Sequence, residues 1–490
     1  MTSNLLWITP LIPVAVGLCM LISRGRRLLA ALDVGGSVAV LGLTLLIARQ
    51  VALTGPVSAA GVFRADDLAV LFLLLVCLLA AATSIATVGW MRQEIDRKEM
   101  REDRLPYYYA LVQGFIATML ITVLADNLGI LWIAMEGTTI TSAVLVGFHG
   151  DKLSLEAAWK YIIVTTIGIS FGLFGTVLIY GAAVHTQGSV VAGAMNWSSI
   201  AAIASRLDPG IVRIGFIFVV VGYGTKAGLA PVHMWLPDAH SQAPTPVSAL
   251  LSGVLIKCAL FGIIRFHTIA RSACGPAFSE GLLLTFGLLS VVVATPFILA
   301  QHDLKRLLGY HSVEHVGIIS LGLGFGGLWG TYGALLHVIN HGVTKALTFL
   351  IAGDAIGRYG TRDMRAIKGY LGIAPWAGTF LLMGAFSLAG TPPFSIFMSE
   401  LIVIRAGLSS GHYVAVAVFL VVVVVIFAGL IHHMGQMAFG VADKTAGREP
   451  EARLLLLGVL LLAAVMVLPG LSIPASLNRV LLRATEIVLG

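Results

Sequence analysis

The chain has 490 residues, of which 58% are apolar and only 11% are charged, and its net charge is +7. Soluble domains carry about 25% charged residues, and a soluble globule of this composition would expose far too much apolar surface. Composition therefore excludes a soluble enzyme, a nucleic-acid-binding protein, a secreted scaffold and a disordered chain, and it predicts a protein embedded in a lipid bilayer.

Apolar stretches long enough to cross a bilayer, which takes about 20 residues, recur along the whole chain. They predict an all-α polytopic membrane protein with about 14 transmembrane helices. A last segment, 474–490, is short and polar enough to lie at the membrane interface. The predicted spans lie near residues 5–23, 28–48, 66–90, 107–125, 127–148, 159–183, 210–230, 245–270, 281–300, 307–325, 329–352, 374–405, 414–439 and 452–469.

The distribution of basic residues predicts how the chain is oriented. Loops after odd-numbered spans hold about 18 Lys and Arg residues, whereas the other loops and the C-terminal tail hold about seven. Because basic residues collect in cytoplasmic loops, both termini are expected outside. The four cysteines are scattered without a C-x-x-C pair, so we expect neither a metal site nor a cofactor in this chain.

Helix breakers occur at corresponding places in two predicted spans. Span seven contains glycines and a proline near 222–231, and span twelve contains Gly390, Pro392 and Pro393 near 388–395. Paired interruptions of this kind predict two inverted five-helix repeats, spans 4–8 and 9–13, each with one broken helix. The expected organisation is an N-terminal three-helix segment, the two repeats, and a last span with its interfacial segment. These parts cover residues 1–105, 106–270, 281–440 and 441–490.

Ionisable residues deep in apolar spans are expensive, and by default they indicate function. In span eleven, three of them are spaced four residues apart and form one stripe along the helix. Lys, Glu and His side chains in apolar surroundings suit a proton relay, because small changes in a neighbouring charge load or unload a proton. The candidate relay residues are Glu136, Lys226, Lys257, His337, His341, Lys345 and Glu400, with His233, His311, Glu314 and His315 as accessory positions.

Each of these residues also has a structural interpretation. Lys226 is then a plug for carbonyl groups freed at the helix break, and Glu136 with Lys257 is a static buried pair. The histidines are satisfied core residues in this interpretation. A metal at His337 and His341 is disfavoured, because no third ligand is evident.

The motifs around these residues resemble a known superfamily. The run Gly222-Tyr-Gly-Thr-Lys-Ala-Gly-Leu-Ala-Pro-Val-His-Met-Trp-Leu-Pro-Asp-Ala-His240 is similar to the signature of antiporter-like membrane subunits. These subunits occur in respiratory complex I, Mrp-type cation/proton antiporters and membrane-bound group 4 nickel–iron hydrogenases. The runs 302–317 and 337–347 resemble further blocks of the same superfamily. The segment 309–319, with its glutamate at position 314, is most similar to hydrogenase-4 component F and its relatives.

The resemblance implies a function and a set of partners. It implies a proton-translocating subunit of a redox-driven complex that moves protons outward from the cytoplasm and holds no redox centre of its own. Expected partners are other antiporter-like membrane subunits, a membrane-anchored hydrogenase or quinone-reductase arm, and the lipid of a bacterial or archaeal cytoplasmic membrane. The alternatives are an Mrp-type Na⁺/H⁺ antiporter subunit, an M-type complex I subunit, and a non-conducting scaffold that docks a hydrogenase arm.

Overall fold

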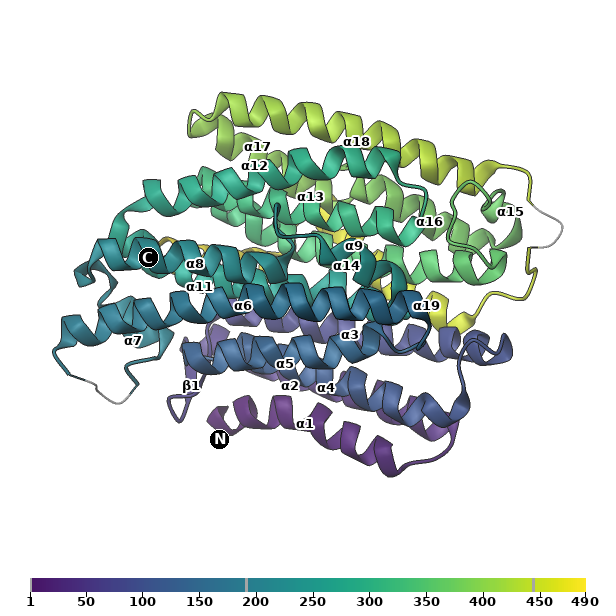
Figure 1. The fold of residues 1–490 in the computed structure, drawn as a ribbon, viewed down its shortest axis with the longest axis horizontal. Helices are drawn as coiled ribbons and strands as arrows, with labels where there is room; N and C mark the ends of the chain where they lie inside the picture. The colour runs from purple at the N-terminus through teal and green to yellow at the C-terminus, as the bar shows by residue number, and fades with distance from the viewer. Residues whose placement is uncertain (1, 190–192, 443–445) are drawn as a thin grey trace.

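The computed structural model describes residues 2–189, 193–442 and 446–490 and consists of long helices that run side by side (Figure 1). The predicted all-α membrane class is confirmed; within the described chain, strand structure is restricted to one small antiparallel hairpin, β1 (Val57–Ala59) and β2 (Phe63–Ala65). The helices are α1 (Thr2–Ile22), α2 (Arg26–Thr54), α3 (Asp67–Asp96), α4 (Leu105–Leu124), α5 (Leu128–Val146), α6 (Lys152–Gln187), α7 (Trp197–Ala202), α8 (Pro209–Ala227), α9 (Trp235–Gln242), α10 (Thr245–Leu250), α11 (Ile256–Cys274), α12 (Pro276–Ala300), α13 (Leu304–Phe325), α14 (Gly327–Tyr359), α15 (Tyr370–Ile373), α16 (Pro375–Leu388), α17 (Ser395–Ser409), α18 (Tyr413–Phe439), α19 (Arg453–Leu471) and α20 (Ala475–Leu489).

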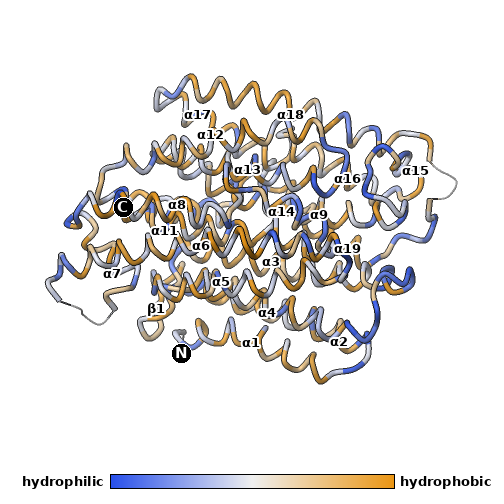
Figure 2. Tube along the Cα trace, viewed as in Figure 1, coloured by the Kyte–Doolittle hydropathy of each residue, from blue (hydrophilic) through white to orange (hydrophobic). Residues whose placement is uncertain are grey.

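Twelve helices of the described chain are long and apolar enough to cross a membrane. Apolar residues dominate the middle of the bundle, and hydrophilic residues gather at its two ends (Figure 2). α13 and the consecutive pair α16 and α17 also pack against the buried helix α14. The predicted number of about 14 spans stays a prediction, because it depends on counting α13 and the interrupted pair as crossings.

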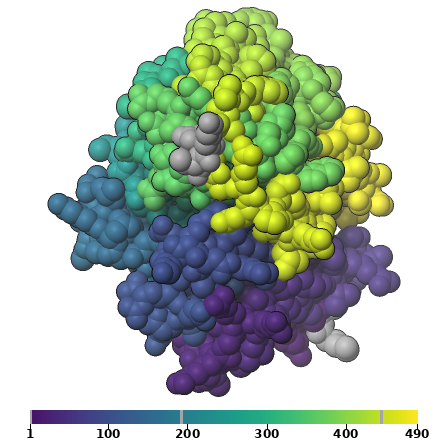
Figure 3. Space-filling model, turned by 90° about the vertical axis from the view of Figure 1, so that its right-hand side faces the viewer, coloured from purple at the N-terminus to yellow at the C-terminus, as the bar shows by residue number. Residues whose placement is uncertain are grey.

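The two termini lie at the same end of the bundle, on the left in Figure 1. The connections α1–α2, α3–α4 and α5–α6 lie at the opposite end. Viewed from that opposite end, N-terminal elements form the lower part of the molecule, and C-terminal elements form its upper and right-hand parts (Figure 3). The chain therefore presents one end with the termini and one end with most of its basic connections.

Two membrane helices are interrupted. α8 ends at Ala227 and α9 begins at Trp235, whereas α16 ends at Leu388 and α17 begins at Ser395. The intervening segments contain prolines, which lack an N–H group and cannot continue a helix. Backbone groups freed at membrane depth need protein partners. The Ala230 N–H donates to Ser290 Oγ at 2.9 Å, and Asn340 Nδ2 donates to the Ser395 carbonyl at 2.6 Å.

The helix pair α6 and α8 packs at unusually short range. A Cβ atom at Gly222 of α8 would lie 2.2 Å from the backbone nitrogen of Gly172 of α6. Small residues let membrane helices approach closely, since packing replaces the missing hydrophobic drive between them. This contact fixes the C-terminal turn of α8, which carries Lys226, against α6.

Two basic residues that the sequence places in orienting loops are buried in the structure. Lys305 is 4% exposed, and its Nζ donates to the Ala243 carbonyl at 2.9 Å. Arg358 is also 4% exposed, and its Nε donates to Asp354 Oδ2 at 2.6 Å. The number of free loop cations is thus smaller than the sequence suggests, because these two cations bind groups inside the protein.

Candidate functional site

Lys226 and Glu136 are connected through one hydroxyl group. Lys226 is fully buried, and its Nζ donates to Thr139 Oγ1 at 2.6 Å. Thr139 Oγ1 in turn donates to Glu136 Oε2 at 3.2 Å. Both Thr139 and Glu136 lie on α5, three residues apart and therefore on one face of the helix. The threonine hydroxyl accepts from the ammonium group and donates to the carboxylate, so it bridges the two ionisable groups.

The other partners of this pair are hydroxyl groups on α6. Lys226 Nζ also donates to the hydroxyl of Tyr161 at 2.7 Å, and that hydroxyl lies 2.7 Å from Ser142 Oγ. Thr166 Oγ1 donates to Glu136 Oε1 at 2.9 Å. Glu136 itself is only partly buried. In this pair, the Lys226 ammonium group is therefore enclosed by protein, whereas the Glu136 carboxylate reaches the outer surface of α5 and α6.

Lys257 lies beside an irregular turn of its own helix. The segment Leu251–Leu255 between α10 and α11 is π-helical, a form that often occurs at functional sites. The fully buried Lys257 Nζ donates to the Ser252 carbonyl at 2.5 Å, and Ser252 Oγ lies 2.8 Å from Ser312 Oγ of α13. The static pair of Glu136 with Lys257 is not formed, because each residue bonds to other partners.

The histidines of α13 and α14 form one stacked group. His315 Nδ1 lies 2.9 Å from His337 Nε2, and the rings of His315 and His341 are stacked with centroids 4.5 Å apart. The ring of His311 stacks on His315 at 5.9 Å. All four rings are fully buried. Neither ring nitrogen of His341 has a hydrogen-bond partner in the described structure, which leaves this ring free to accept or donate a proton.

Carboxylates lie at two edges of this histidine group. Glu314 Oε2 lies 2.8 Å from His311 Nδ1. Glu400 on α17 has a carboxylate oxygen within 4.8 Å of ring nitrogens of both His315 and His337. On the same helix, Ser399 Oγ lies 3.0 Å from His337 Nδ1. The break before α17 thus brings a carboxylate from a distant part of the sequence to the histidine group.

Lys345 follows the same stripe on α14. It is fully buried, and its Nζ donates to the Leu308 carbonyl at 2.6 Å. The structure therefore gathers the predicted residues into two groups. One contains Glu136 and Lys226, and the other contains Lys257, His311, Glu314, His315, His337, His341, Lys345 and Glu400. No hydrogen bond or ion pair within the described ranges joins the two groups.

His233 stands apart from both groups. It lies in the segment between α8 and α9 and is 7% exposed, with its ring centroid 6.5 Å from that of Tyr310. His240, which sequence reasoning missed, is a stronger candidate. It is fully buried on α9, neither of its ring nitrogens has a partner in the described structure, and its ring lies 5.2 Å from Phe349. The Lys345 ammonium lies 5.9 Å from the same phenylalanine ring.

A polar cavity of about 420 Å³ opens at the end that carries the basic connections. Its lining includes Glu94, His149, Ala243, Lys305 and Arg362. Ala243 follows α9 directly, three residues after His240. Burial lowers the pKa of His149, in the connection between α5 and α6, to about 4. One lining residue of the cavity, Ala243, is thus three residues from the buried and unpartnered His240.

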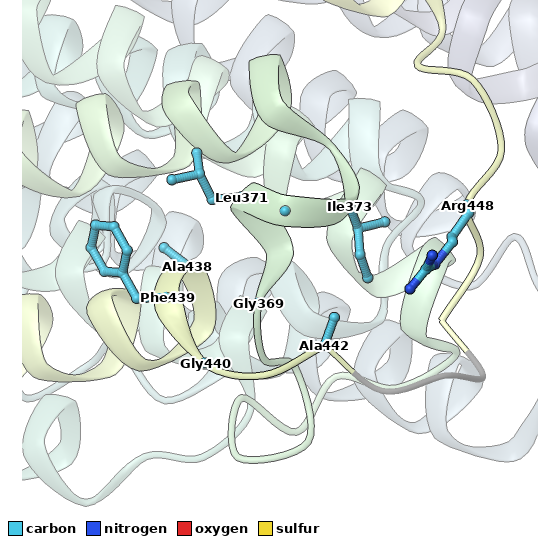
Figure 4. A pocket seen from close by; sticks show the side chains of 9 residues that line it. Gly369, Leu371, Ile373, Ala438, Phe439, Gly440, Ala442 and Arg448 are labelled. Atoms are coloured by element: carbon cyan, nitrogen blue, oxygen red, sulfur yellow. The ribbon is translucent and has the colours of Figure 1, made fainter.

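A second surface cavity, of about 400 Å³, has a different character. It lies where α15 and the end of α18 meet, and among the described residues Arg448 is the only charged one in its lining (Figure 4). Its other lining residues are apolar or glycine. None of them belongs to the two ionisable groups.

The spacing of the buried histidines suits hydrogen bonding. A tetrahedral zinc ion bound about 2.0–2.1 Å from each nitrogen would hold the two nitrogens about 3.3 Å apart, whereas His315 Nδ1 and His337 Nε2 lie 2.9 Å apart, at hydrogen-bond distance. Among the described residues, the possible ligand group at this place consists of His315, His337 and Glu400 and does not include His341. The expectation that the chain holds no metal or cofactor remains a prediction.

The chain is similar to a family of membrane subunits in sequence and to two solved membrane-complex subunits in structure. Residues 125–428 match the family model described as NADH:quinone oxidoreductase/Mrp antiporter, TM. The hydrogenase-4 component F homolog of Methylacidiphilum infernorum is 37% identical over 379 residues, which cover 77% of this chain and 79% of that protein. A chain of the archaeal membrane-bound sulfane sulfur reductase superposes with a TM-score of 0.87 at 25% identity, over 99% of this chain and 97% of that one. A chain of respiratory complex I from Thermus thermophilus superposes with a TM-score of 0.82 at 22% identity over the full length of both, which shows the shared fold.

Proposed function

The chain belongs to the membrane-subunit family of NADH:quinone oxidoreductases and Mrp antiporters, and we propose that it translocates protons as an antiporter-like subunit of a membrane-bound, hydrogenase-type complex. The observation that carries the proposal is the stacked group of buried histidines between two lysines and a carboxylate, Lys257, Lys345 and Glu400. Such residues inside a membrane mark ion paths by default. The similarity to the hydrogenase-4 component F homolog supports the hydrogenase type of complex.

The chemistry of the group favours protons over sodium ions. Hard metal cations bind oxygen ligands, whereas most of the buried groups here are ammonium and imidazole nitrogens, which carry protons. His315, His337 and His341 lie within stacking or hydrogen-bonding distance of one another. Rotation of these rings with proton exchange between them passes a proton without moving the backbone. A sodium path would need a row of carbonyl, hydroxyl and carboxylate oxygens instead.

Protons enter this relay from the end with the basic connections, which we place at the cytoplasm. Ala243, which lines the polar cavity beside Lys305, lies three residues after His240. The rings of His240 and Phe349 are 5.2 Å apart, and the Lys345 ammonium lies 5.9 Å from the same phenylalanine ring. From Lys345 and Lys257 the proton passes through the histidine group to Glu400 and leaves on the side of the termini. Both termini then lie outside, in accord with the distribution of basic loops.

Glu136 and Lys226 act as the switch in this proposal. While the Glu136 carboxylate is charged, the Thr139 hydroxyl transmits its field to the Lys226 ammonium and keeps that group protonated. Glu136 is only partly buried on a face of α5 and α6 where Ile133, Ile140 and Ile163 are exposed. A charged carboxylate facing lipid is costly, so a neighbouring membrane subunit covers this face. Movement or charge in that neighbour alters Glu136 and releases the proton of Lys226.

The chain works in this role together with partner subunits in a membrane. Its partners are other antiporter-like subunits and a peripheral hydrogenase or quinone-reductase arm that holds the redox cofactors, and its place is the cytoplasmic membrane. Its parts are the three-helix segment 1–105, the inverted repeats 106–270 and 281–440, and the terminal part 441–490, of which residues 443–445 lie outside the described structure. In this division, one interrupted helix belongs to each of the two repeats.

The test is proton uptake by inverted membrane vesicles that contain the assembled complex with Glu400→Gln. The proposal predicts loss of substrate-driven proton uptake while the redox reaction continues. Glu156→Gln, at an exposed carboxylate on α6, is the matched control and should pump normally. A scaffold without conduction predicts normal pumping by Glu400→Gln. Uptake that requires sodium and no redox substrate would identify an Mrp-type antiporter subunit.

A further inference from the structure

Asp33 is a buried carboxyl group outside both ionisable groups. It lies on α2 and is 1% exposed. Gln113 Nε2 of α4 donates to Asp33 Oδ1 at 2.8 Å and lies 3.3 Å from Ser37 Oγ. Ser37 Oγ lies 2.9 Å from Ser84 Oγ of α3. Asp33 therefore lies where three helices meet, and its hydrogen-bonded neighbours are neutral.

No cation compensates a charge on Asp33 in the described part of the chain. α1 carries no charged residue. At the nearest helix ends, Arg26 pairs with Glu102 and Arg92 pairs with Asp96, and Arg27 is exposed. The titratable groups of α4 on this side are the phenols of Tyr108 and Tyr109, which are neutral at physiological pH. An isolated ionised carboxylate in such surroundings is strongly disfavoured, and the group takes up a proton instead.

An open cavity approaches Asp33 from the end with the basic connections. Its volume is about 400 Å³, and Ala30, Val88 and Tyr109 belong to its lining. Each of these residues lies one helical turn from a member of the Asp33 group: Ala30 from Asp33, Val88 from Ser84, and Tyr109 from Gln113. Arg26, Arg27 and Arg92 complete the polar part of the lining. Water at this cavity is thus separated from the carboxyl group by about one layer of side chains.

One polar atom of the Asp33 network is left without a partner in the described structure. Gln113 is fully buried, and its Oε1 has no hydrogen-bond partner. Buried polar atoms of this kind are usually satisfied. A free acceptor close to a carboxyl group is what a carboxylic acid O–H group or an inserted water requires.

We propose that Asp33 is a second protonation site, which takes up a proton from water in the cavity between α2, α3 and α4. The site is independent of the relay through α13 and α14, and it lies outside the segment 125–428 that matches the family model. Proton uptake converts the carboxylate into a carboxylic acid whose O–H group uses an acceptor of the Gln113, Ser37 and Ser84 network. The N-terminal three helices then contribute an ionisable group of their own.

Carbodiimide labelling of the assembled complex tests the protonation state. These reagents add to protonated carboxyl groups, and the O–H group adds across the C=N bond. Lipid-soluble dicyclohexylcarbodiimide should label Asp33 in membranes at pH 7.5, as detected by mass spectrometry of the peptide, and Asp33→Asn should abolish the label. Labelling of Asp33 in acid-unfolded protein but not in the folded protein would overturn the proposal. Protection of Asp33 by sodium would also overturn it, because the site would then hold a metal cation.

The route of access is tested with a water-soluble carbodiimide. Ala30→Phe places a large side chain into the cavity and should slow the labelling of Asp33 several-fold. Ala31→Phe is the matched control, since Ala31 is exposed, and its labelling rate should equal that of the wild type. Equal rates in Ala30→Phe and Ala31→Phe would contradict access through this cavity.

Discussion

The hydroxyl of Thr139 offers the sharpest perturbation of the proposed switch. Thr139→Val keeps the shape of the side chain but removes the oxygen that accepts from Lys226 Nζ at 2.6 Å and donates to Glu136 Oε2 at 3.2 Å. A hydrogen bond to a charged group contributes about 1.5–3 kcal/mol. One pKa unit corresponds to about 1.4 kcal/mol, so loss of one such bond weakens the coupling between the two residues roughly tenfold to a hundredfold.

The assay is substrate-driven acidification of inverted vesicles at matched redox turnover. Thr139→Val should lower the initial pumping rate by at least tenfold, and combining it with Glu136→Gln should add little further loss. Thr138→Val is the control, because the neighbouring Thr138 hydroxyl is buried but bonds the Met135 carbonyl of its own helix. Normal pumping by an assembled Thr139→Val complex would refute the bridge. Equal losses in both threonine variants would assign the effect to packing of α5.

Three further predictions address other parts of the structure. Ser399→Ala removes the hydroxyl 3.0 Å from His337 Nδ1 and, at about 1 kcal/mol for a neutral hydrogen bond, should slow proton uptake by vesicles roughly fivefold; unchanged rates would separate His337 from the relay. Gly222→Ala would place a Cβ atom 2.2 Å from the Gly172 nitrogen. Overpacking costs about 1–3 kcal/mol, so this variant should lower the Tm of the purified protein. Gly181→Ala is the control and should leave the Tm unchanged, because the space around its Cβ position is open. Burial lowers the pKa of His149 to about 4. Below about pH 6.5, the unfolded state therefore binds more protons than the folded state. The stability of the protein should fall as the pH drops from 6.5 to 4, and His149→Gln should flatten this part of the thermal-shift profile.

Much of the relay was predictable because each member violates the apolar pattern of its own span. Glu136, Lys257 and the stripe of His337, His341 and Lys345 are conspicuous in the sequence for this reason alone. Helical periodicity also predicted that the stripe lies on one face of α14. Helix breaks were predictable from glycine and proline, since these residues act through the local backbone.

Contacts between helices were not predictable in the same way. The sequence indicated Glu136 and Lys226 as candidate relay residues, whereas the structure connects them through the Thr139 hydroxyl. Threonine is common in membrane helices and gives no signal of its own. Similarly, Lys305 and Arg358 resemble ordinary loop cations, because the carbonyl groups of Ala243 and Glu449 that bind them come from distant segments. His240 ends the quoted signature, yet only its burial without partners distinguishes it.

Proton translocation controlled by buried ionisable residues is the central claim, and Lys226→Met tests it most directly, because it removes the proposed switch. Methionine approximates the length of lysine and removes only the titratable ammonium group, so the complex should assemble and retain its redox reaction. The account predicts that vesicles containing this variant lose proton uptake driven by the redox substrate. Proton uptake at the wild-type rate by a fully assembled Lys226→Met complex would contradict it.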